Sequence, residues 1–163
     1  IDVSLVGSEM CIRDRTYPDF YDVACSSAGN HDNNIYNKWW SETHNGVEAV
    51  YKKSKDDEGN EVQELTWDAR IKTNQSLAEN LKGHLLLTHG NIDNNVHPTN
   101  SLRVADELIK AGKRFDMMIF PGKRHGYGSF RSYYEKMMWY YFAEHLLGDY
   151  RDNVDIDLPE SNR

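Results

Sequence analysis

Residues 84–100 read HLLLTHGNIDNNVHPTN, and the organisation of the second half of the chain follows from them. The run His84–His89 has three leucines at its centre, which predicts a fully buried strand. The next residues, Gly90–Asn95, are small and polar and predict a loop. Pro98 and Thr99 then form a credible start for a helix.

That helix is expected to end near Gly112 and to be followed by a second apolar strand, Asp116–Phe120. Its predicted apolar face consists of Leu102, Ala105, Leu108 and Ile109. A Pro-Gly turn closes the second strand, and a loop that carries His125 leads into a final helix from about Ser129 to Leu147. Strand, loop and helix in repeated order predict βαβ units in a parallel sheet, and therefore the α/β fold class.

Asp93 and His125 are the candidate chemical residues of this sheet. Each follows a predicted strand, and neighbouring parallel strands bring the loops at their carboxyl ends to one edge. An imidazole can take a proton from a serine and return it to a leaving amine, while a carboxylate orients the ring. Asp93 precedes His125 by 32 residues, with one helix and one strand between them. α/β-Hydrolases place the two triad partners in this chain order.

The first half of the chain has weaker patterns. Val23–Ser27 is a short run of apolar and small residues that predicts a buried strand. The polar and aromatic stretch Asn30–Trp40 is expected to be an irregular loop or a short helix. Two β-compatible runs between Val50 and Trp67 flank the turn residues Asp57–Asn60, which predicts a hairpin. Asn74 is expected to cap a short helix.

Composition excludes several classes of protein. A net charge of -7 argues against nucleic-acid binding, and no apolar run is long enough for a transmembrane segment. The two cysteines make neither a disulfide framework nor a zinc pattern. His89, Asp93 and His97 recur every four residues, which would suit metal ligands on a helix. The Gly, Asn and Pro residues around them disfavour a helix, so no metal is expected.

Three stretches carry a resemblance to a known family. Residues 85–97 (LLLTHGNIDNNVH) resemble the segment with the triad aspartate in the prolyl oligopeptidase family, and residues 120–127 (FPGKRHGY) resemble its triad-histidine segment. Thr16–Phe20 with Val23–Ser27 is similar to the helix end and strand that follow the nucleophile. The dipeptidyl peptidase IV branch is the closer match. The resemblance implies that 16–149 is the carboxy-terminal part of an α/β-hydrolase fold, incomplete at its amino-terminal side.

The resemblance also implies roles for particular residues. Asp93 would orient the imidazole, and His125 would act as general base and general acid. Asn95 stands where that branch contacts a substrate carbonyl, and Val96 stands where it lines the pocket for the residue before the cleaved bond. Aromatic walls of the same pocket would come from Tyr36 with Trp39 or Trp40.

The nucleophile of such a triad is missing from the sequence. No Gly-x-Ser-x-Gly occurs, and Ser8, Ser26 and Ser27 lack the required glycines. The family pattern would place this motif about a dozen residues before Thr16, where residues 1–15 form a leader that we expect to be non-native or disordered. Residues 150–163 are expected to be a flexible acidic tail. The chain alone is therefore predicted to be inactive.

These observations together favour a fragment of a serine peptidase that releases amino-terminal dipeptides. Two alternatives stay open: an α/β-hydrolase that acts on other acyl substrates such as esters, and a non-catalytic binding module with a hydrolase-like fold. No cofactor is expected because a triad supplies its own acid–base chemistry. The expected partner is a peptide substrate, and the full-length parent is compatible with a homo-oligomer. The compartment is left open, with a periplasmic or extracellular setting suggested only by the resemblance.

Overall fold

The computed structural model describes residues 13, 15–45, 47–57, 59–68, 73–150, 155, 156 and 158. The chain forms two compact units, which are described separately: one combines residues 1–31 with 73–163, and the other is residues 32–72. Most of the predicted leader and most of the predicted tail lie outside the described residues. No helix in the described part of the chain is long and apolar enough to cross a membrane.

A three-stranded parallel sheet is the centre of the first unit. It has the order β1-β4-β5, formed by β1 (Val23–Ser27), β4 (His84–Gly90) and β5 (Asp116–Phe120). The register pairs β1 with β4 from Val23 opposite His84, and β4 with β5 from Leu86 opposite Asp116. The predicted strands, their parallel arrangement and the α/β class are confirmed.

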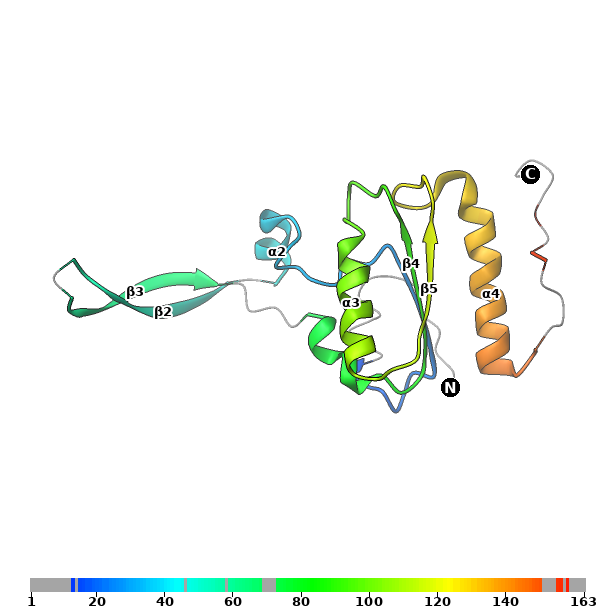
Figure 1. The fold of residues 1–163 in the computed structure, drawn as a ribbon, viewed down its shortest axis with the longest axis horizontal. Coiled ribbons are helices and arrows are strands. Elements are labelled where there is room, and N and C mark those ends of the chain that lie inside the picture. The colour runs from blue at the N-terminus through cyan, green and yellow to red at the C-terminus, as the bar shows by residue number, and fades with distance from the viewer. Residues whose placement is uncertain are drawn as a thin grey trace. The chain divides into compact units, whose positions relative to one another are not determined.

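Helices cover both faces of this sheet (Figure 1). On one face lie the 3₁₀ helix η1 (Gln75–Asn80) and α3 (Thr99–Lys110). The opposite face is covered by α4 (Arg131–Leu147), which follows a single 3₁₀ turn, η2 (Gly128–Phe130). The α4 helix ends at Gly148, whose φ of 65° suits a glycine C-cap.

The core is divided between the two faces because successive strand residues point in opposite directions. On the α3 side the buried cluster contains Ala24, Ala78, Leu81, Leu85, Leu87, Val104, Ala105 and Leu108. The cluster on the α4 side contains Phe120, Tyr127 and Tyr134, with Met118 and Met137 packed against it. In the final helix Tyr134, Met137 and Met138 are thus packing residues, whereas Trp139 and Tyr140 are exposed.

The predicted apolar face of α3 is only half right. Leu102 and Ile109 are 53% and 67% exposed, whereas the buried residues are Asn100, Ser101, Val104, Ala105 and Leu108. The hydrophobic spacing of the sequence alone predicted that the large side chains of Leu102 and Ile109 would be buried. The helix instead buries a face one position away, on which Ser101 Oγ lies 2.8 Å from Nδ1 of His89 in the central strand β4.

Two smaller expectations are right only in part. Asn74 is the N-cap residue of η1, as predicted, but its side chain makes no capping hydrogen bond, and its amide lies 2.7 Å from His31 Nδ1. His84, the first residue of β4, is exposed although the rest of the strand is buried.

The second unit contains the predicted hairpin. Antiparallel strands β2 (Glu48–Lys55) and β3 (Glu61–Asp68) pair from Glu48 opposite Asp68 to Lys55 opposite Glu61. Gly59 takes a φ of 86° in the turn, a conformation that glycine adopts without strain. A short helix, α2 (Lys38–Asn45), precedes the hairpin, so the stretch expected to be a loop or short helix becomes helical at Lys38.

Candidate active site

The triad candidates Asp93 and His125 meet at the carboxyl ends of neighbouring strands. The register sets Gly90, the last residue of β4, opposite Phe120, the last residue of β5. The two loops therefore leave the sheet side by side. Nδ1 of His125 lies 2.8 Å from Oδ2 of Asp93, although the residues are 32 apart in the chain.

The two loops are held together by close backbone packing. A Cβ on Gly90 would lie 2.3 Å from the carbonyl oxygen of Lys123, so only glycine allows this approach. The Ile92 N–H donates to that same carbonyl at 3.2 Å. The Gly122 N–H donates to the side-chain oxygen of Asn91 at 2.7 Å. These contacts set the position of His125, which follows Lys123 by two residues.

Asp93 is buried and its carboxylate accepts hydrogen bonds on both oxygens. Oδ1 accepts the backbone N–H groups of Asn95 at 2.9 Å and Val96 at 3.1 Å, and Oδ2 faces His125. Burial alone would raise the pKa of Asp93. The bonds from His125, Asn95 and Val96 outweigh burial and hold this pKa below its ordinary value. The carboxylate is therefore ionised at neutral pH.

His125 has the arrangement that a general base requires. An ionised carboxylate can only accept, so Nδ1 carries the proton and donates it to Asp93. Nε2 then keeps its lone pair and is available to take a proton. The side chain is 45% exposed, in contrast to the buried Asp93 side chain, so the imidazole can be reached from outside.

Tyr127 holds the loop that carries His125 against the sheet. Its φ is 66° and its side chain is fully buried. The hydroxyl lies 2.9 Å from Ser27 Oγ on β1 and 2.7 Å from Thr88 Oγ1 on β4, and Thr88 in turn donates to the carbonyl of Ser26. Burial raises the pKa of Tyr127, although the bonds to Ser27 and Thr88 oppose this. One side chain thus fixes the loop to two strands.

The predicted substrate-binding residues are in two places. Asn95 is exposed and Val96 is 5% exposed, and both belong to the loop that carries Asp93. Tyr36, Trp39 and Trp40 lie in the second unit, where the two tryptophan rings on α2 pack edge to face with centroids 5.8 Å apart. Their part in a substrate pocket stays a prediction.

Sequence reasoning missed two members of this site. The sequence indicates His89 only as the end of a strand and as part of a disfavoured metal pattern; its Nδ1 bonds Ser101, and its Nε2 lies 3.4 Å from Asp93 Oδ2. Tyr127 was read only as part of the histidine motif. A buried polar residue directly before Gly90 was a usable signal for the first, because buried polar groups need partners.

The metal hypothesis gains no support from the geometry. His97 is exposed and its Nδ1 bonds Thr99 Oγ1 at 2.7 Å, away from the Asp93 carboxylate. Among the described residues, no group of three or more His, Cys, Asp or Glu side chains is arranged to hold a metal ion.

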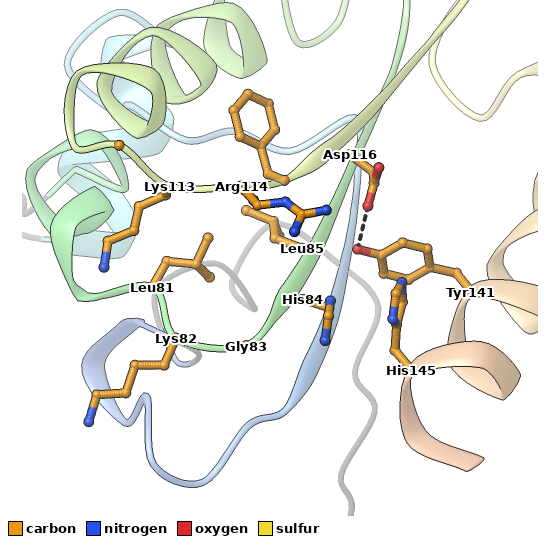
Figure 2. A pocket seen from close by; sticks show the side chains of 12 residues that line it. Leu81, Lys82, Gly83, His84, Leu85, Lys113, Arg114, Asp116, Tyr141 and His145 are labelled. Atoms are coloured by element: carbon orange, nitrogen blue, oxygen red, sulfur yellow. Dashed lines mark hydrogen bonds between the residues drawn. The ribbon is translucent and has the colours of Figure 1, made fainter. Parts of the chain in front are cut away.

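A separate pocket of about 530 Å³ opens at the amino ends of β4 and β5, opposite the candidate site. Figure 2 shows His84 and His145 facing each other there, with stacked rings 3.9 Å apart, and the Tyr141 hydroxyl directed at Asp116. Burial, followed by the nearby His84, lowers the pKa of His145. None of the predicted site residues lines this pocket.

Comparison with known proteins gives the family. The sequence model that describes the prolyl oligopeptidase family, which consists of peptidases, matches residues 9–149. This chain belongs to the prolyl oligopeptidase family. The paired Asp93 and His125 are thus found in a chain of a serine peptidase family, and the predicted recognition is confirmed.

Relatives within the prolyl oligopeptidase family include dipeptidyl peptidases. Dipeptidyl peptidase family member 1 of Caenorhabditis elegans is 37% identical over 65 residues, which cover 40% of this chain and 8% of the relative. Dipeptidyl peptidase 8 of Mus musculus is 38% identical over 64 residues, covering 38% of this chain and 7% of the relative. The stretch of the chain that matches therefore spans less than a tenth of the length of these curated relatives.

Solved structures of the family share the fold. A putative dipeptidyl aminopeptidase IV from Bacteroides ovatus superposes with a TM-score of 0.69 at 19% identity, over 89% of this chain and 19% of that one. An acylaminoacyl peptidase from Pyrococcus horikoshii gives a TM-score of 0.61 at 17% identity, over 94% and 25% of the two chains. The chain thus corresponds to a portion of an α/β-hydrolase domain.

Proposed function

We propose that this chain supplies the aspartate and the histidine of a Ser-Asp-His triad in a peptidase that releases dipeptides from free amino termini. The observation that carries the proposal is the 2.8 Å contact between His125 Nδ1 and an Asp93 carboxylate that is held by two backbone N–H groups. The dipeptidyl specificity is supported by relatives named dipeptidyl peptidases.

In this mechanism Nε2 of His125 takes the proton from the serine hydroxyl as its oxygen attacks the substrate carbonyl carbon. The imidazolium that forms is stabilised by Asp93, which stays ionised because its pKa lies below the ordinary value. His125 then gives the proton to the leaving amine, and a second cycle with water releases the acyl group. We propose that Asn95 and Val96 position the substrate, with aromatic walls from Tyr36 and Trp39 or Trp40.

The serine that this mechanism needs does not occur in a nucleophile motif of this sequence. The chain as given should therefore not react with a fluorophosphonate probe, which labels activated serines. Labelling of any serine in this chain, detected by mass spectrometry of the tryptic peptides, would contradict the hypothesis that the nucleophile lies outside this sequence.

The decisive experiment extends the chain. The source DNA should be read in frame upstream of Thr16, and the extended protein expressed. A Gly-x-Ser-x-Gly motif there, fluorophosphonate labelling of its serine, and turnover of dipeptidyl chromogenic substrates with a free amine would support the proposal. Turnover of esters without peptides would favour the esterase alternative, and a native leader without the serine would favour a binding module.

A further inference from the structure

His89 is a buried imidazole beside the Asp93–His125 pair. It stands one residue before the end of β4 and is fully buried. Its Nε2 lies 2.8 Å from the carbonyl oxygen of Val96 and 3.4 Å from Asp93 Oδ2, the oxygen that also bonds His125. Its Nδ1 lies 2.8 Å from Ser101 Oγ.

The partners of His89 determine where its proton resides. A carbonyl and an ionised carboxylate only accept, so Nε2 must be the N–H, and Nδ1 must accept from the Ser101 hydroxyl. Burial lowers the pKa of His89, against opposition from the Val96 carbonyl and the Asp93 carboxylate. The ring is therefore neutral, and its one N–H binds the Val96 carbonyl at 2.8 Å, while Asp93 Oδ2 lies 3.4 Å from the same nitrogen.

The bond from His89 to the Val96 carbonyl also fixes a residue that donates to the carboxylate. Val96 donates its N–H to Asp93 Oδ1 at 3.1 Å, while its carbonyl accepts from His89. Both oxygens of Asp93 consequently face fixed donors on opposite sides. Rotation of the carboxylate away from His125 would break contacts at both oxygens, and a buried carboxylate without partners is strongly disfavoured.

We propose that His89 is a positioning residue for Asp93: its neutral Nε2–H, oriented by the Ser101 hydroxyl, binds the Val96 carbonyl and so holds the Val96 N–H on Asp93 Oδ1, which keeps the carboxylate in the rotamer that holds His125 in the Nδ1–H tautomer. His89 acts through Asp93 and takes no proton itself. The proposal deepens and rests on the proposed triad roles of Asp93 and His125.

The test is NMR spectroscopy of the chain with ¹⁵N-labelled histidine, which reports the tautomer of His125 and the exchange of its Nδ1 proton with water. His89→Leu should increase the Nε2–H tautomer of His125 and speed exchange of the Nδ1 proton about tenfold, because the bond that fixes Val96, a donor to Asp93, is lost. His89→Gln, which keeps an N–H donor, should recover most of the signal. His97→Leu is the matched control, because this exposed histidine of the same loop bonds Thr99 and not Asp93.

Unchanged His125 signals in a folded His89→Leu chain would overturn the proposal. Equal losses in His89→Leu and a folded His89→Gln would assign the effect to packing and would also overturn it. If His89→Leu shows no cooperative unfolding, Ser101→Ala decides, since loss of the hydroxyl should shift the same signals in the same direction and unchanged signals would refute the role. Because the readout is the imidazole and not turnover, absence of peptidase activity in an extended protein would be a separate result.

Discussion

Replacing Gly90 with alanine tests how the loops of Asp93 and His125 are held together. The added Cβ would lie 2.3 Å from the carbonyl oxygen of Lys123, and ordinary contact begins at 3.4 Å, so that carbonyl would have to retreat by about 1.1 Å. The next nearest atom is another backbone carbonyl, that of Arg124, at 2.8 Å. Neither can rotate away as a flexible side chain would.

The expected cost follows from these distances. Overpacking of this kind destabilises by about 1–3 kcal/mol. The bond from Ile92 N–H to the Lys123 carbonyl, already 3.2 Å long, would be lost, which adds about 1 kcal/mol. Gly90→Ala should therefore lower the free energy of unfolding by about 2–4 kcal/mol. His125 follows Lys123 by two residues, so its contact with Asp93 should lengthen as well.

Urea unfolding measures the change in the free energy of unfolding, and the ¹⁵N spectrum of His125 reports the change in its contact with Asp93. Gly112→Ala is the control: its Cβ would meet no atom within 4 Å, but its φ of +67° should cost about 1 kcal/mol. The control should leave the His125 signals unchanged. A Gly90→Ala chain that is no less stable than the control, with His125 signals of the unsubstituted chain, would refute the argument that the close backbone approach builds the site.

Three further predictions follow from single contacts. Tyr127→Phe removes a buried hydroxyl that joins two strands and should lower the free energy of unfolding by about 1–2 kcal/mol in urea, whereas Tyr51→Phe, at a side chain 66% exposed, should have no measurable effect. Burial, then Arg15 and His89, lowers the pKa of His31 to about 3, so protonation favours the unfolded chain. The contribution of His31 to stability should be complete above pH 6.5, and between pH 6.5 and pH 3 the folding equilibrium constant should fall by up to tenfold per pH unit. His31→Gln should flatten this pH dependence of unfolding. An equal slope in both chains would contradict the role of His31. In an extended protein that carries the serine, Asp93→Asn should lower kcat by about 10⁴-fold because it removes the acceptor that sets the tautomer of His125; a loss below tenfold would exclude the triad role.

The elements that position the site could be predicted because their signals are local. The three leucines of β4 and the apolar run of β5 specify buried strands wherever they are found. Parallel strands place their following loops at one edge, so the meeting of Asp93 and His125 followed from chain order and sheet geometry. The turn residues of the β2–β3 hairpin acted in the same local way.

The rest depended on contacts between residues that are far apart in the chain. Ser27 and Tyr127 are 100 residues apart, and His31 and Asn74 are 43 apart, so no local pattern links them. The buried face of α3 and the contact of His89 with Asp93 were likewise decided by which polar groups the packed sheet brought within hydrogen-bonding distance. Apolar burial is non-directional and can be read from periodicity, whereas a hydrogen bond requires two particular atoms about 3 Å apart, and only the assembled fold places them there.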